Sequence, residues 1–170
     1  DIAVGRLTVA TADELRDVVN KIVAYETSAQ TYDWEKRLVF TADNESEKFE
    51  HDNWLIEQML LPAYTPTEIF LSRFPNPADA NTRLLDEWLS GALFVNYIGH
   101  GALQYWASEK VLKNADADSI TNPAGLPVVV SMNCTDGYFL NTDENDISLA
   151  ESLFKGKGGA VAVWAPAAQA

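Results

Sequence analysis

Two short apolar runs, each leading into a polar turn bounded by glycine, constrain the fold of this chain more than any other feature. The first run covers residues 92–98 (ALFVNYI) and leads into GHG at residues 99–101. The second covers residues 126–132 (LPVVVSM) and leads into NCTDG at residues 133–137. Short Val-rich runs flanked by Gly or Pro are typical of parallel strands buried on both faces. Because ligands bind at the carboxyl edge of parallel sheets, we expect these two turns to form the functional site.

Segments that favour strands and helices alternate along nearly the whole chain. Apolar patterning predicts further strands at residues 37–42, 68–71 and 160–164, and residues 1–9 are also strand-like. Helices are predicted at about residues 49–61, 77–90 and 148–154, while residues 102–127 are expected to be irregular between the two buried strands. This alternation predicts an α/β fold, with a mostly parallel sheet and helices on both of its faces.

The first helix is expected to begin at a capping box formed by Thr11 and Glu14. Apolar side chains then recur at helical spacing, which predicts one buried stripe made of Leu15, Val18, Val19, Ile22 and Val23.

Length and composition bound the function classes. A chain of 170 residues with 47% apolar residues is expected to form one domain, residues 1–170, with a sizeable core. Its formal net charge of −13 argues against nucleic acid or an anionic membrane as partner. One cysteine excludes an internal disulfide, and no apolar run is long enough to span a bilayer. The chain lacks an initiator Met and a signal-peptide pattern, so we expect it to be an excerpt of a longer, processed multidomain protein.

The single cysteine and one of the two histidines follow the two buried strands. A lone Cys is usually a small buried apolar residue, but here Cys134 and His100 are both expected at one sheet edge and both are followed closely by Gly. A thiolate nucleophile needs a neighbouring base or cation, and histidine fills that role near neutral pH. The backbone N–H groups of Gly101 and Cys134 are the expected oxyanion donors. The sequence therefore predicts a cysteine peptidase.

Several stretches together resemble the gingipain family, peptidase family C25, of the caspase-like cysteine peptidases. These stretches are DIAVGRL, KIVAYE (Lys21–Glu26), VNYIGHG followed by WA, CTDGYF, SLAESL and GGAVAVWAP, and the interval from His100 to Cys134 is 34 residues. The resemblance runs nearly end to end. It implies a three-layer α/β sandwich, the C-terminal half of a gingipain-type catalytic domain, and endopeptidase activity of the cysteine type.

The resemblance also implies roles for individual residues. Cys134 would attack the peptide carbonyl, His100 would carry the proton to the leaving amine, and Gly101 with Cys134 would hold the oxyanion. Asp43 matches the family's acidic residue near the catalytic His and is assigned to orient His100, although a solvated loop acid or helix N-cap is an equal reading. The nearby Glu45 and Glu47 are interpreted as a solvated face, with calcium as an alternative.

One departure concerns substrate specificity. Arginine-specific gingipains carry an acid that reads the basic side chain of the substrate, and Lys48 falls at that position here. A lysine cannot pair with an Arg substrate, so Arg or Lys specificity is not carried over, although Glu47 or Glu50 could substitute if the register differs by one. The other predicted substrate-binding residues are Tyr105, Trp106, Asn133 and Trp164, where core packing is the alternative for the Tyr and both Trp side chains.

No cofactor is expected to be required, but structural calcium is considered. The polar loop of residues 141–146 (NTDEND) has oxygen ligands at alternate positions, with Asp143 and Asn145 as the candidate ligands. It lacks the Gly and the distal Glu of an EF-hand, which makes the pattern a partial one.

Three functions are compatible with these features. The first is a bacterial cysteine endopeptidase, secreted or on the cell surface, that acts on protein or peptide substrates and works beside flanking domains of the same chain. The second keeps the acyl-enzyme but resolves it with an amine, as in sortase-like transpeptidases of bacterial secretion systems. The third is a non-catalytic surface or adhesion module with calcium loops, which an intact pair of His100 and Cys134 argues against.

Overall fold

The centre of the molecule is a five-stranded parallel sheet. The computed structural model describes residues 4–28, 32–122, 125–140 and 146–168. The strands are β1 (Arg37–Ala42), β2 (Thr65–Phe70), β3 (Phe94–Ile98), β7 (Val128–Met132) and β8 (Ala162–Trp164). They lie in the order β2-β1-β3-β7-β8, and every neighbouring pair is parallel. The predicted α/β class and mostly parallel sheet are therefore confirmed.

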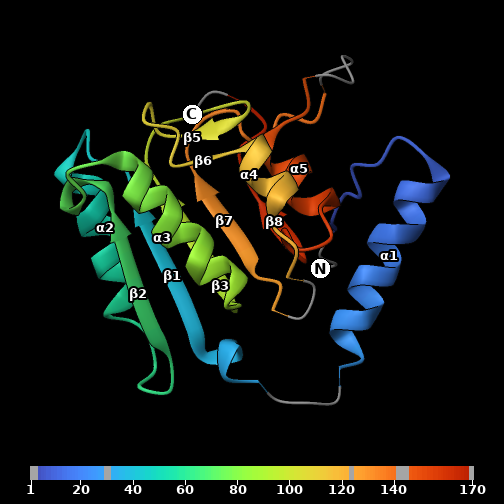
Figure 1. The fold of residues 1–170 in the computed structure, drawn as a ribbon, viewed down its shortest axis with the longest axis horizontal. Helices are drawn as coiled ribbons and strands as arrows, with labels where there is room; N and C mark the ends of the chain where they lie inside the picture. Colours follow the sequence, from blue (N-terminus) through green and yellow to red (C-terminus); the bar gives the residue numbers. More distant parts are fainter. Residues whose placement is uncertain (1–3, 29–31, 123–124, 141–145, 169–170) are drawn as a thin grey trace.

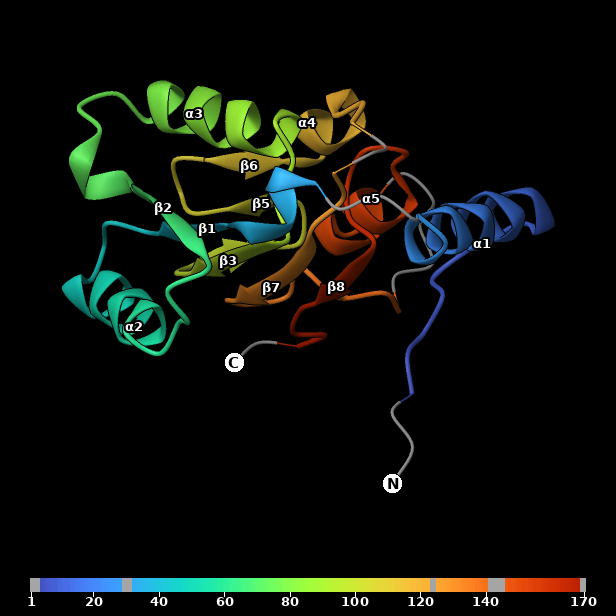
Figure 2. The same cartoon turned by 90° about the horizontal axis from the view of Figure 1, so that it is seen from below.

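Helices cover both faces of this sheet (Figure 2). On one face lie α3 (Pro77–Leu89), α4 (Asn114–Ser119) and α5 (Leu149–Lys155). The main core lies between them and the sheet, with Val39, Val95 and Val129 contributed by three successive strands. On the opposite face lies α2 (Glu47–Glu57), which covers a smaller cluster around Phe40. Successive strand residues point to opposite faces, so the same strands supply both cores and form the middle of a three-layer sandwich.

The cover on the α2 face is incomplete. Helix α2 packs against β1 and β3, and β7 and β8 lie beyond it. As a result, two large apolar side chains on this face remain accessible, Met132 at 47% and Trp164 at 62% exposure. Both stand at the carboxyl ends of their strands.

The first helix, α1 (Ala12–Glu26), begins as predicted but does not bury the predicted stripe. Thr11 Oγ1 accepts a hydrogen bond from the backbone N–H of Glu14, which is one half of the predicted capping box, but the Glu14 carboxylate accepts from the backbone N–H of Ala10 and not from that of Thr11. Within the stripe only Val18 is fully buried, whereas Leu15, Val19 and Val23 are 41%, 40% and 51% exposed. The prediction is wrong because α1 lies beside the body of the sandwich and not on the sheet (Figure 1).

Helix α1 is held mainly by polar contacts to α5. Lys21 Nζ donates to the backbone carbonyls of Phe154 and Gly156, where α5 ends. Lys155 Nζ lies 3.5 Å from Glu14 Oε2. Basic side chains near a helix C-terminus satisfy carbonyls that have no partner within the helix, so Lys21 caps α5 from outside.

The stretch predicted to be irregular is ordered. It contains a small antiparallel sheet of β4 (Gly101–Ala102), β5 (Tyr105–Trp106) and β6 (Leu112–Lys113), followed by α4. The Trp106 ring stacks on Tyr97 of β3 at 4.5 Å between centroids, which joins this small sheet to the main core. Strands of two residues are too short for apolar alternation to reveal.

Most other boundaries agree with the predictions within a few residues. Asn76 caps α3 with Pro77 at its first turn, and Gly91 follows the helix with a φ of 83°. Residues 4–9 form no strand, contrary to expectation. Two short 3₁₀ helices were not predicted, η1 (Asp33–Lys36) and η2 (Leu71–Arg73). In the described part of the chain, no helix has the length and apolar character needed to cross a bilayer.

Candidate active site

The strand register brings three loops together at the carboxyl edge of the sheet. Ala42, Ile98 and Met132 are register partners across β1, β3 and β7. The residues that follow these strands therefore meet, as predicted from the two apolar runs. Gly99 is needed at this junction, because a Cβ there would lie 2.3 Å from Asp43 Cβ.

Asp43 holds the backbone of the histidine loop. Its side chain is fully buried, and its Oδ2 accepts a hydrogen bond of 2.9 Å from the backbone N–H of His100. Its Oδ1 accepts from the backbone N–H of Glu45 at 3.3 Å. Asp43 thus lies beside His100, as the resemblance implies, but among the described contacts it fixes the main chain and not the imidazole. The reading of Asp43 as a solvated loop acid is wrong.

Glu45 is the acid at the imidazole. Its Oε2 lies 3.4 Å from His100 Nε2, and its Oε1 accepts a hydrogen bond of 2.6 Å from Ser108 Oγ. Glu45 is 47% exposed, which agrees with its interpretation as part of a solvated face, but the structure adds a contact with the imidazole that this interpretation lacked. A positional signal existed, because Glu45 follows the end of β1 by three residues, but several acids share that loop and sequence alone does not separate them.

His100 and Cys134 line one cavity of about 400 Å³. The Phe49 ring stands edge-on to the imidazole, with centroids 5.4 Å apart and planes at 89°. The described residues that line this cavity come from α2, the carboxyl ends of β3, β7 and β8, and the loops that follow: Phe49, Gly99, His100, Ser131, Met132, Asn133, Cys134, Trp164 and Pro166. The structure thus places Asn133 and Trp164 where they were predicted, next to the cysteine.

The turn that carries Cys134 is tightly held. The next residue, Thr135, is β-branched and adopts a φ of 60°, a region that such residues rarely occupy. The backbone N–H of Thr135 donates to Ala168 at 3.3 Å, and that of Asp136 donates to the Cys134 carbonyl at 2.9 Å. A strained turn of this kind persists only where its surroundings fix it, so the position of the thiol is constrained.

Asp136 also holds the turn that carries Cys134. Trp106 Nε1 and Ser131 Oγ donate to its Oδ2 at 2.8 Å and 2.6 Å. Burial of this side chain raises the pKa of Asp136, and the hydrogen bonds oppose that rise. Trp106 is fully buried in this network, so its prediction as a wall of the substrate cleft is wrong, because its ring packs on Tyr97. Tyr105 is half-buried under Lys110 and does not line the cavity.

The close approach of Asn133 requires glycine at position 101. A Cβ at Gly101 would lie 2.4 Å from Asn133 Nδ2, and Asn133 is 6% exposed. The glycine after the histidine therefore lets Asn133 pack between the two catalytic loops. The oxyanion role of Gly101 and Cys134 stays a prediction.

Lys48 lies outside the cavity of Cys134. It forms an ion pair with Asp52 one turn along α2, and it lines a separate open hollow with Glu47, Glu50 and Arg73. The prediction that Lys48 contacts the substrate beside the cysteine is not supported by this placement, because α2 points Phe49 toward the cavity and Lys48 away from it.

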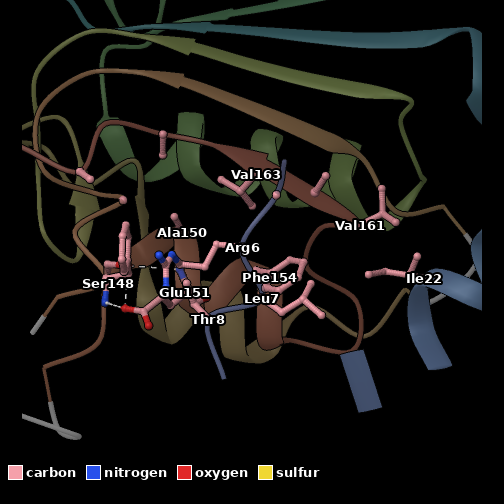
Figure 3. Close-up of a pocket in the computed structure, with 16 residues that line it drawn as sticks. Arg6, Leu7, Thr8, Ile22, Ser148, Ala150, Glu151, Phe154, Val161 and Val163 are labelled. Atoms are coloured by element: carbon pink, nitrogen blue, oxygen red, sulfur yellow. Dashed lines mark hydrogen bonds between the residues drawn. The ribbon is translucent and has the colours of Figure 1, made fainter. Parts of the chain in front are cut away.

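A second cavity, of about 390 Å³, lies between the N-terminal segment, α5 and β8 (Figure 3). Arg6, Leu7 and Thr8 close it against α5 and β8. Its main polar groups, Ser148 and Glu151, are engaged in the capping box of α5. This cavity holds neither His100 nor Cys134 and shows no catalytic arrangement among its described lining residues.

Metal ligands are not gathered in the described structure. No group of three or more His, Cys, Asp or Glu side chains there could hold an ion. The candidate calcium ligands Asp143 and Asn145 lie outside the described residues. Asp146, at the end of the same loop, accepts a hydrogen bond of 2.8 Å from Gln104 Nε2.

Two solved structures of similar fold are of gingipain R (RgpB). The crystal structure of the Arg-specific cysteine proteinase gingipain R (RgpB) matches with a TM-score of 0.74 and 22% identity, over 94% of this chain and 39% of that one. A complex of the pro- and mature domains of Porphyromonas gingivalis RgpB matches with a TM-score of 0.73 and 22% identity, over 94% of this chain and 40% of that one. The gingipain-like α/β fold implied by the sequence is thereby confirmed.

Sequence comparison points to the same proteins. Gingipain R2 and gingipain R1 of Porphyromonas gingivalis are each 25% identical to this chain over 149 residues, or 82% of it. The match covers 20% of that gingipain R2 and 14% of that gingipain R1, so the chain spans a fifth or less of these relatives. The family model of peptidase family C25 matches residues 1–170. The chain therefore belongs to peptidase family C25.

Proposed function

We propose that this chain carries the catalytic centre of a cysteine endopeptidase. The observation that carries the proposal is that Cys134 and His100 line one cavity at the carboxyl edge of the sheet, with Glu45 on the imidazole. A thiol, an imidazole and a carboxylate in this order are the components of an activated nucleophile. Membership of family C25 and the gingipain-like fold support the same reading.

The reaction follows from the chemistry of these groups. The Cys134 thiolate attacks the peptide carbonyl carbon, and the tetrahedral intermediate collapses by breaking the C–N bond, which leaves a thioester on Sγ. His100, protonated when the thiolate forms, gives its proton to the leaving amine. It then removes a proton from a water molecule that hydrolyses the thioester. Backbone N–H groups of Gly101 and Cys134 are the proposed donors to the oxyanion.

Glu45 and Asp43 are proposed as positioning residues. The Glu45 carboxylate lies beside the imidazole, with Oε2 3.4 Å from His100 Nε2, and is itself held by Ser108. Asp43 fixes the backbone of both His100 and Glu45, so one buried acid sets the distance between them. Such an arrangement limits the rotation of the imidazole between its two proton-transfer partners.

The proposed substrates are proteins or peptides, and the proposed location is outside the bacterial cell or on its surface. Two of the similar solved structures and the curated relatives are gingipains, and gingipain R among them is an Arg-specific proteinase. We propose that domains flanking this chain complete the protein.

The test is the reactivity of Cys134 with iodoacetamide against pH, followed by mass spectrometry in the intact protein. A free thiol ionises at about pH 8.5 and a thiol paired with His at a lower pH, so rapid labelling at about pH 6 is expected. His100→Ala should slow this labelling, whereas His51→Ala is the matched control, because His51 is the other histidine and stacks on Trp54 away from the site. Labelling that is slow at pH 6 and indifferent to both substitutions would overturn the proposal.

A further inference from the structure

We propose that the cavity beside Cys134 selects an apolar side chain at P1, the residue on the acyl side of the cleaved bond. This inference rests on the proposed function, and it adds the substrate class. The carbonyl carbon attacked by Sγ is bonded to the Cα of P1, so the P1 side chain must enter the space next to the thiol. That space is the cavity of about 400 Å³ shared by Cys134 and His100.

Apart from the two uncharged polar side chains Ser131 and Asn133 and the pair of His100 and Cys134, the side chains that line the cavity are apolar. The Phe49 ring stands on one side next to the imidazole, and Met132 and Trp164 stand on the sheet. Pro166 contributes a further apolar surface. Among the described lining residues, His100 and Cys134 are the only side chains that can carry a charge, and both belong to the catalytic pair.

The sheet architecture explains why these side chains are available. Val130 is the register partner of Trp164, and Met132 lies two residues further along β7 on the same face. Helix α2 covers β1 and β3 but not these strands, so Met132 and Trp164 retain large accessible areas. The incompletely covered corner of the sheet is therefore the floor of the proposed P1 pocket.

The carboxylates near the cavity already have other interaction partners. Asp43 and Asp136 are fully buried with hydrogen-bond partners from the backbone, Trp106 and Ser131. Both oxygens of Glu45 are engaged, one with His100 and one with Ser108. An Arg or Lys side chain in the cavity would lose water without gaining a carboxylate from the described residues.

The acids of the adjoining hollow do not reach the cavity either. Glu47, Glu50 and Glu68 line that hollow together with two cations, Lys48 and Arg73. Arg73 forms an ion pair with Glu68 and Lys48 with Asp52. Burying an unpaired cation is costly, whereas an apolar P1 side chain gains from contact with the ring and thioether surfaces. The described residues thus favour Leu, Met or Phe over Arg or Lys at P1.

The first experiment compares peptide acyloxymethyl ketone probes that differ only at P1, on the intact protein, with labelling of Cys134 read by mass spectrometry. Probes with Leu, Met or Phe are expected to react at least about 100-fold faster than those with Arg or Lys, since an apolar pocket strongly disfavours a charged side chain. Equal rates, or a faster Arg probe, would overturn the inference while leaving the proposed function intact. No labelling by any probe would overturn both.

A second experiment places an acid in the pocket. Met132→Glu is expected to raise the ratio of Arg to Leu probe rates by about tenfold or more, because a guanidinium then gains a charge-assisted partner. The chain has two methionines, and Met59→Glu is the matched control, since Met59 is 83% exposed beyond α2 and lines no part of the cavity. Thermal unfolding checks that both variants fold. An unchanged ratio in a folded Met132→Glu variant would place P1 elsewhere and overturn the inference.

Discussion

At the scale of single residues, the acid next to the imidazole is the most informative position in the site. Glu45 contacts His100 through one oxygen and Ser108 through the other, so its orientation is fixed although the side chain is accessible. Asp43 acts indirectly, because its carboxylate accepts hydrogen bonds from the backbone N–H groups of both residues. Two acids of the same loop therefore have different tasks, one on the ring and one on the chain that carries it.

We predict that Glu45→Gln lowers kcat about tenfold and changes KM little, because it weakens proton transfer by a positioned base without touching the P1 cavity. Glu47→Gln is the matched control, since Glu47 lies two residues further along, at the start of α2, and lines the separate hollow. Steady-state kinetics on a peptide substrate give both parameters. A loss confined to KM, or equal losses in the two variants, would contradict the assignment.

A second residue-scale prediction concerns Glu57. Burial, and then the neighbouring Glu68 carboxylate, raise the pKa of Glu57 to about 7. A folded-state pKa above the unfolded value of about 4.3 means that the native state binds the extra proton between these two pH values. The stabilisation is therefore complete below about pH 4.3 and is lost as the pH rises through about 7.

Glu57→Gln mimics the protonated carboxyl, so it should match the wild type at pH 4, below both pKa values, and exceed it at pH 8. Much of the side chain is accessible, and after discounting for solvent screening the gain is about 1 kcal/mol, or about 2–4 °C in Tm. Thermal unfolding at both pH values measures it, with Asp17→Asn on the exposed side of α1 as control. A gain that is equal at both pH values would argue against the titration of this pair.

At the scale of elements, α1 shows how polar contacts can fix a helix whose apolar face is accessible. Lys21 caps the C-terminus of α5 through two carbonyls, and its ammonium also lies 5.3 Å from the Phe154 ring centroid. We predict that Lys21→Ala speeds amide hydrogen exchange in residues 12–26 by about tenfold, since a hydrogen-bonded charge contributes about 1.5–3 kcal/mol. Lys157 is exposed and follows the end of α5, so Lys157→Ala should leave amide exchange in α1 unchanged. Equal exchange in the two variants would mean that Lys21 does not hold the helix in place.

The elements also show what a sequence can predict. Parallel strands bury both faces, so β3 and β7 appear as nearly continuous apolar runs, and their order in the chain places His100 and Cys134 at one edge. The stripe of α1 has helical spacing too, but spacing does not say what covers a face, and Val19 and Val23 remain exposed. The contact of Glu45 with His100 depends on two bonds of Asp43. One is a local turn in which Asp43 accepts from the backbone N–H of Glu45, and the other is a long-range bond to the His100 backbone that no local pattern encodes.

At the scale of the whole molecule, the site depends on unequal cover of the two sheet faces. One face is closed by α3, α4 and α5 over a continuous core, which fixes the register of all five strands. The other face is closed only over β1 and β3, which leaves the carboxyl ends of β7 and β8 accessible beside the thiol. A rigid sheet with one open corner is suited to hold catalytic groups still while a substrate side chain enters.

The charge of the whole molecule sets the last prediction. The chain has 25 acidic and 12 basic side chains, so its formal charge is −13. Self-repulsion of this size destabilises the compact state, and raising ionic strength from about 0.01 M to about 0.15 M shortens the screening length from about 30 Å to about 8 Å. We expect Tm to rise by a few degrees over this range in NaCl, measured at pH 7.5, whereas an equal osmolarity of a neutral solute should not reproduce the shift. The ion pairs, such as Arg37 with Glu87, are weakened by the same screening. A Tm that falls with salt would therefore show that these pairs outweigh the repulsion.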